Sequence, residues 1–286
     1  MRLMAFRAGP DFNIFAAGDT HEGNAAFSEK AFTKFADMFF SEYEGVGRDK
    51  NWLIHMGDPG DFIARTDTRH DPKIHRQSVL NQFDRIVDRY RPFQPQTLGM
   101  LDSNHPLTLD PLGNVTEYLC HKLDIEYLTY SGKFTFLTKQ KEELMFKLFA
   151  THGRKTINSS ADDEIRVEAN KQLILKRHLK RKASDCAVML KGHAHKLVVA
   201  PPTPKLSLAD NLKRLVQFYP DPTKYHHMDY IPWELRWYAC TGSFLRTYLL
   251  DANTYSEKAE YDPVDLGFCI VMVRDRKIKE VRGIQL

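Results

Sequence analysis

The chain has 286 residues, of which 42% are apolar and 27% charged, and its formal net charge at pH 7 is +4. These values are ordinary for a globular protein and exclude a disordered or fibrous chain. No run approaches the ~18 consecutive apolar residues that span a membrane, and the opening MRLMAFRAGPDF lacks the long apolar core of a secretion signal. We therefore expect a cytoplasmic protein without a membrane partner.

The cysteines and the basic charge set further limits. Cys120, Cys186, Cys240 and Cys269 are far apart, with no CxxC spacing, which is typical of free buried thiols in a reducing compartment. The predicted pI of about 8.7 suits an anionic substrate. It is weak support for a nucleic-acid partner, because many enzymes without one are equally basic.

Short apolar runs alternate with segments of helical periodicity over the first two thirds of the chain. We expect strands at residues 12–18, 51–57, 97–101, 133–138, 144–153 and 186–190. We expect helices at residues 25–43, 74–90, 116–125 and 163–185, the last with acids early and bases late, as the helix dipole favours. This alternation predicts a layered α/β fold.

The amino-acid composition changes after Ala200. Residues 201–214 read as a proline-rich connector, and the segment that follows mixes aromatic residues, prolines and histidines. Residues 267–286 predict a hairpin that turns at Asp275 and Arg276. The simplest organisation is a single domain over residues 1–286, with 201–237 as a candidate substrate-specificity insertion.

Side chains that can bind metal ions follow the predicted strands, where loops of layered α/β folds gather into active sites. In chain order they are Asp19 and His21 in GDTH, Asp58 and Asp61 in GDPGD, Asn104 and His105 in DSNHP, His152 in ATHG, and His193 and His195 in GHAH. Mixed nitrogen and carboxylate ligands suit Mn, Fe, Zn or Ni, whereas oxygen alone would suit Mg or Ca.

The order D-x-H, GD-x-x-D, N-H, H-G, G-H-x-H resembles the calcineurin-like metallophosphoesterase family, in particular its phage and bacterial members of phosphodiesterase or nuclease type. The resemblance covers residues 19–195, about two thirds of the chain. It implies a β-sandwich flanked by helices, in αββα order. It also implies a metal-dependent phosphoric ester hydrolase with a dinuclear centre, in which a hydroxide bridging the two metals attacks phosphorus.

The resemblance also assigns the ligands. One divalent cation, manganese or another transition metal, would be held by Asp19, His21, Asp58 and His195. The second would be held by Asp58, Asn104, His152 and His193. Asp58 would then bridge the two cations.

His105 matches the family's catalytic histidine, which protonates the leaving alkoxide or stabilises charge on the phosphate. The family usually reads GNHD or GNHE, with an acid that orients this histidine, whereas Pro106 follows His105 here. Either another carboxylate, such as Asp61 or Asp102, takes over the orienting role, or catalysis depends less on His105.

Two further residues have open roles. Asp61 is either a turn residue or a group that supports a metal ligand from behind. Arg154, directly after His152 and Gly153, either holds a substrate phosphate or is a solvated loop charge.

The substrate class is the least constrained inference. GDPGD is closer to the GDxxD of phosphodiesterases and double-strand-break repair nucleases than to the GDxVDRG of protein phosphatases. This favours a phosphodiesterase acting on a nucleotide, a nucleic-acid end or a cyclic phosphodiester. The alternatives are a phosphomonoesterase for small molecules and a non-catalytic, metal-binding scaffold. The oligomeric state is left open.

Overall fold

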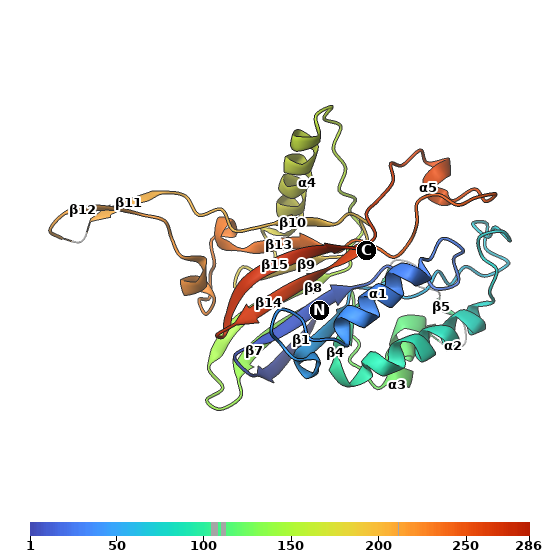
Figure 1. Cartoon of the computed structure of the whole chain (residues 1–286), viewed down its shortest axis with the longest axis horizontal. Coiled ribbons are helices and arrows are strands. Elements are labelled where there is room, and N and C mark those ends of the chain that lie inside the picture. The colour runs from blue at the N-terminus through green and yellow to red at the C-terminus, as the bar shows by residue number, and fades with distance from the viewer. Residues whose placement is uncertain (104–107, 110–112, 211) are drawn as a thin grey trace.

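Two β-sheets lie face to face, with helices on both outer sides (Figure 1). The computed structural model describes residues 1–103, 108–109, 113–210 and 212–286. The expected αββα arrangement of a β-sandwich flanked by helices is confirmed. Among the described residues, no helix combines the length and the apolar character needed to cross a bilayer.

The first sheet has five strands and carries the first two predicted site loops. In spatial order its strands are β15 (Lys277–Gln285), β14 (Gly267–Arg274), β2 (Phe12–Ala17), β3 (Asn51–His55) and β4 (Thr97–Met100). The neighbours β2, β3 and β4 are parallel, whereas β14 runs antiparallel to β2 and to β15. Ala17 pairs with His55, so β2 and β3 end level with each other.

The second sheet has six strands and carries the later site loops. In spatial order its strands are β1 (Arg2–Ala8), β7 (Ser131–Thr138), β8 (Leu144–Thr151), β9 (Val188–Lys191), β13 (Trp237–Cys240) and β10 (Val198–Ala200). The parallel strands β8 and β9 also end level, because Thr151 pairs with Lys191. Two short antiparallel pairs lie outside the sheets: β5 (Thr108–Leu109) with β6 (Gly113–Asn114), and β11 (Ser207–Asp210) with β12 (Leu215–Phe218).

Helices cover the outer faces of the sandwich. They are α1 (Glu29–Phe39), α2 (Val79–Tyr90), α3 (Val115–Leu123) and α4 (Glu164–Leu179). The short α5 (Tyr255–Lys258) lies in the loop between β13 and β14, and the 3-10 turns are η1 (Arg48–Lys50), η2 (Arg91–Gln96), η3 (Pro222–Tyr225) and η4 (Trp233–Leu235). The first three lie on one side of the strands and α4 on the other (Figure 1). Both α1 and α2 begin later than predicted, because Ser28 and Ser78 accept backbone hydrogen bonds and cap them.

The alternation of side chains along each strand builds three apolar layers. Between the sheets, Ile14 and Ile54 pack with Leu148 and Val271. The opposite face of the five-stranded sheet packs an aromatic cluster around Phe35 under α1, α2 and α3. The outer face of the six-stranded sheet packs against α4.

Residues 201–214, predicted as a connector, contain strand β11, and the candidate insertion at 201–237 partly forms a strand pair. It contains the β11–β12 pair, which projects away from the sandwich in Figure 1. Since β10 runs antiparallel to β13, with Val198 opposite Cys240, the chain leaves β10 at the amino end of β13. Its role in specificity stays a prediction.

Candidate metal centre

The carboxyl ends of β2, β3, β8 and β9 meet at one edge of the sandwich, which we call the site edge. Level strand ends within each sheet place the loops that follow them side by side. A cross-sheet hydrogen bond joins the two halves, since the Nδ1 of His152 lies 2.8 Å from the carbonyl oxygen of Met56. Ligand-type side chains from both sheets therefore converge.

Six of the seven predicted ligands are described, and they form two groups. Asp19, His21 and His195 make one group, in which the ligand atoms all lie within 4.8 Å of one another. Asp58, His152 and His193 make the other by the same measure. Each group has the size and donor chemistry to hold a divalent transition metal.

Asp58 lies between the two groups. Its Oδ2 is 3.2 Å from the Nε2 of His152 in its own group and 3.7 Å from the Nε2 of His21 in the other. Asp19 closes the first group, with its Oδ1 3.2 Å from the Nε2 of His195. Asp58 thus faces one histidine of each group.

The tautomers of two histidines fit cation binding. The carbonyl of Met56 can only accept, so the Nδ1 of His152 must donate to it, and a neutral His152 turns a lone pair on Nε2 toward Asp58. His21 repeats the pattern, with its Nδ1 3.0 Å from the carboxylate of Asp61. A lone pair facing a carboxylate is stable only with a proton or a metal ion between them.

The electrostatics favour positive charge at the site edge. Burial lowers the pKa of His21, but its hydrogen bond to Asp61 and the charge of Asp58 outweigh burial and raise this pKa to about 9. Burial also lowers the pKa of His152, and the nearby Asp58 turns the net shift upward. Burial raises the pKa of Asp19, but the hydrogen bond to His195 and the charges of His195 and His152 together bring this pKa below its usual value. Asp19 is therefore ionised, and the neighbouring imidazoles attract protons or metal ions.

Strained backbone is concentrated in these ligands. Asp19, His21, Asp58, His193 and His195 all have positive φ, between 47° and 69°. This left-handed region costs a residue with a side chain roughly 1–2 kcal/mol, although Asp and His tolerate it better than most. Such strain at a cluster of polar residues is typical of a functional site.

Two glycines allow the sheets to approach each other. Gly57 has φ +100°, and a Cβ there would lie 2.5 Å from the Nδ1 of His152. A Cβ on Gly192 would lie 2.8 Å from the carbonyl oxygen of Met56. Any larger residue would push the two groups of ligands apart.

Contacts behind the ligands include residues that the motif pattern did not reveal. Asp61 binds His21 through Oδ1, while its Oδ2 accepts from Asn24 at 2.9 Å and lies 3.0 Å from the Nε2 of His75. The buried Lys191 donates to the backbone carbonyls of His152 and Gly192. Lys191 directly precedes the GHAH motif, so the sequence places it near the site. Nothing in the sequence of the loop at 59–78 distinguishes His75 from its neighbours.

The remaining predicted residues are placed less directly. Asn104 and His105 lie outside the described residues. Asp102, just before them, accepts hydrogen bonds from the backbone of Ser103, from Asn114 at 2.8 Å and from Tyr127 at 2.7 Å. Arg154 is exposed and contacts Tyr130, so its substrate role stays a prediction.

No family model matches the chain, and no curated protein does. Three solved structures align with most of it at low identity. They are a predicted phosphoesterase from Streptococcus pneumoniae (11% identity, TM-score 0.32, covering 98% of this chain and 100% of that one), a metallophosphoesterase from Sphaerobacter thermophilus (10%, 0.38, 95% and 89%) and the anchor in the inner membrane complex of Plasmodium (10%, 0.37, 96% and 89%). All three likenesses are distant, so what this chain does has to be inferred from its own residues.

Proposed function

We propose that the protein is a calcineurin-like metallophosphoesterase that hydrolyses phosphate esters with two divalent metal ions, and that its substrates are phosphodiesters. The observation that carries the proposal is Asp58, whose Oδ2 lies within 3.7 Å of a histidine in each group. A carboxylate placed in this way matches a shared ligand. The order of the five motifs along the chain supports the same conclusion.

The described residues would divide the cations between them. Asp19, His21 and His195 would hold one, and His152 and His193 the other, with Asp58 common to both. Bound in this way, two cations supply hydroxide near neutral pH and draw charge from a phosphoryl group. Asn104 completes the proposed ligand set.

The protein's own side chains have three tasks in this reaction. Asp61 and the carbonyl of Met56 keep the Nε2 atoms of His21 and His152 turned toward Asp58. The two carboxylates only half neutralise two divalent cations, so the loaded site stays positive and favours an anionic ester. His105 would donate the proton that the leaving alkoxide requires.

The substrate class rests on the sequence of the second loop and on charge. GDPGD has the form found in phosphodiesterases, and the net charge of +4 suits a nucleotide or nucleic-acid substrate. The four cysteines are free and buried, as expected for a protein of the reducing cytoplasm.

Hydrolysis of bis-p-nitrophenyl phosphate and of p-nitrophenyl phosphate by the metal-free protein, with and without Mn²⁺, tests the proposal. We expect Mn²⁺-dependent hydrolysis that is faster for the diester. A clear preference for the monoester would overturn the diesterase assignment in favour of a phosphomonoesterase. Tight binding of two metal ions without turnover of either ester would favour the non-catalytic scaffold.

A further inference from the structure

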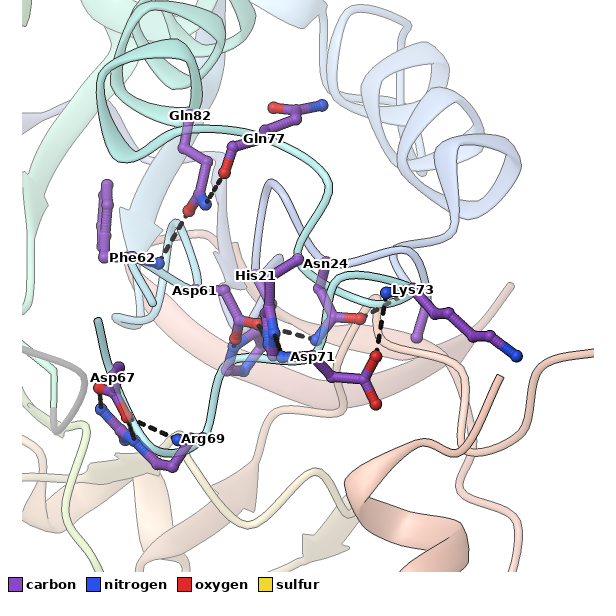
Figure 2. Close-up of polar contacts among 12 residues, drawn as sticks. His21, Asn24, Asp61, Phe62, Asp67, Arg69, Asp71, Lys73, Gln77 and Gln82 are labelled. Atoms are coloured by element: carbon purple, nitrogen blue, oxygen red, sulfur yellow. Dashed lines mark hydrogen bonds and ion pairs between the residues drawn. The ribbon is translucent and has the colours of Figure 1, made fainter. Parts of the chain in front are cut away.

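Asp61 is the centre of a buried hydrogen-bond chain that reaches from the proposed ligand His21 into the long loop at residues 59–78. The side chains of Asp61, His21 and Asn24 lie together (Figure 2). The Nε2 of His75 lies 3.0 Å from the Oδ2 of Asp61. All three members of the His75, Asp61 and His21 chain are less than 9% exposed.

The backbone fixes the tautomer of His75. The N–H of Asp71 donates to its Nδ1 at 2.9 Å, so Nδ1 acts as the acceptor. In the neutral imidazole the hydrogen is then on Nε2, which donates it to Asp61. His75 therefore presents a donor, in a fixed direction, to the carboxylate behind the metal centre.

Asp61 passes this orientation on to the site. Its Oδ2 accepts from His75 and Asn24, and its Oδ1 receives the Nδ1–H of His21. A neutral histidine that donates through Nδ1 has its lone pair on Nε2, free to bind a metal ion in place of a proton. The Nε2 of His21 lies 3.3 Å from the Nε2 of His195 and 3.7 Å from Asp58, inside the ligand cluster.

Besides the hydrogen bond from Asp71 to the imidazole of His75, several contacts that do not involve this imidazole hold the loop. Gln82 accepts from the N–H of Phe62 and donates to the carbonyl of Gln77, and Asp67 and Asp71 accept from the backbone amides of Arg69 and Lys73 (Figure 2). The N–H of Ala25 also donates to the carbonyl of Ile74 at 2.9 Å. Replacing His75 should therefore leave the loop in place.

We propose that His75 is a positioning residue of the metal centre, which acts through Asp61 to hold His21 in the tautomer and direction that bind a divalent cation. The inference rests on the proposed function, because it requires His21 to be a metal ligand. Partners behind metal ligands of this kind contribute ~10–100-fold to metal affinity.

Calorimetric titration of Mn²⁺ into the metal-free, full-length protein tests the role of His75. We expect His75→Leu, which removes the donor, to weaken one of the two binding events by ~10–100-fold. His75→Gln, which keeps an N–H donor of similar reach, should restore most of the affinity. Thr68→Leu, at an exposed position of the same loop, is the control and should bind Mn²⁺ as the wild type does.

The absorption spectrum of the Co²⁺-loaded protein provides a second readout, because it reports the geometry of the ligands around the metal. We expect it to change in His75→Leu and to recover in His75→Gln, while melting in metal-free buffer shows that both variants fold. Unchanged affinity and spectrum in His75→Leu would overturn the role of His75 alone. A wild type that binds no metal would overturn the proposed function and this inference with it.

Discussion

Charged side chains are paired differently at the two ends of the six-stranded sheet. At the amino end of β9, Asp185 receives the ammonium groups of Lys133 and Lys147 at 2.6–2.8 Å. Just before β13, the buried guanidinium of Arg236 donates to the carbonyl of Ile231. At this end, each of these charged groups therefore has a hydrogen-bonding partner within the protein.

The site edge, at the carboxyl ends of β8 and β9, matches carboxylates with imidazoles. Asp19 faces His195, and Asp58 faces His152. An imidazole, unlike an ammonium group, can give up its proton and bind a metal ion at neutral pH. One end of the sheet therefore has ion pairs between permanently charged groups, whereas the other end has imidazoles, which can exchange a proton for a cation.

Removing a carboxylate at each end should give the largest contrast. We expect Asp58→Asn to lower the rate of phosphodiester hydrolysis by more than ~10²-fold, because losing partners behind the metal ligands already costs ~10–100-fold. Initial rates on bis-p-nitrophenyl phosphate with Mn²⁺ measure the effect.

Asp185→Asn is the matched control at the other end. It should keep the wild-type rate while lowering the free energy of unfolding, because Lys133 and Lys147 lose their shared anion. Equal losses of activity in the two variants would contradict the division between the two ends.

Metal ions should stabilise the protein through binding at the site edge and not through Asp185 at the other end. At ~100 times the dissociation constant, each bound Mn²⁺ should add ~2.7 kcal/mol to the free energy of unfolding and raise the melting temperature by roughly 4–5 °C. Differential scanning calorimetry with and without a chelator measures this shift. The shift should persist in Asp185→Asn and shrink in Asp58→Asn, and a shift of equal size in both would contradict the location of the site.

His226, which packs near Phe146 of β8, should make the stability of the protein depend on pH. Burial lowers the pKa of His226 to about 4 from its usual 6.5. Below pH 6.5 the unfolded chain takes up a proton there that the folded protein does not, so stability falls by ~1.4 kcal/mol per pH unit until about pH 4. Relative to the wild type, His226→Phe should therefore gain ~2 kcal/mol between pH 7 and pH 5. Urea unfolding at both pH values tests this, and parallel curves would remove His226 as a cause.

Backbone strain at the site edge should give the smallest effect. His195 has φ 49°, which glycine adopts at little cost and alanine does not. In metal-free buffer we expect His195→Gly to be more stable than His195→Ala by ~0.5–1 kcal/mol. Both variants lack the imidazole, so the difference isolates the backbone. Equal unfolding free energies would show that the left-handed conformation is not strained there.

Periodicity predicted the central elements well and the peripheral ones poorly. The strands at 12–17, 51–55 and 144–151 are mostly apolar and largely buried, and they are present where predicted. The edge strand at 2–8 was not predicted, because its apolar residues at 3–6 are consecutive and do not alternate, although only Met4 and Phe6 of these pack against the core. The last predicted helix ends at Leu179 rather than at 185, where the chain turns back to enter β9.

The sequence alone determined which residue types follow which strands. The order of these motifs predicted six side chains that the structure brings together as two groups. Only the tertiary structure decided that these groups share an edge, because that depends on strand register and on the cross-sheet contact of His152 with Met56. His75 could not be found from sequence, since its place beside Asp61 comes from the path of an irregular loop. Local patterns encode strands and helices, whereas contacts between distant loops depend on how the whole chain packs.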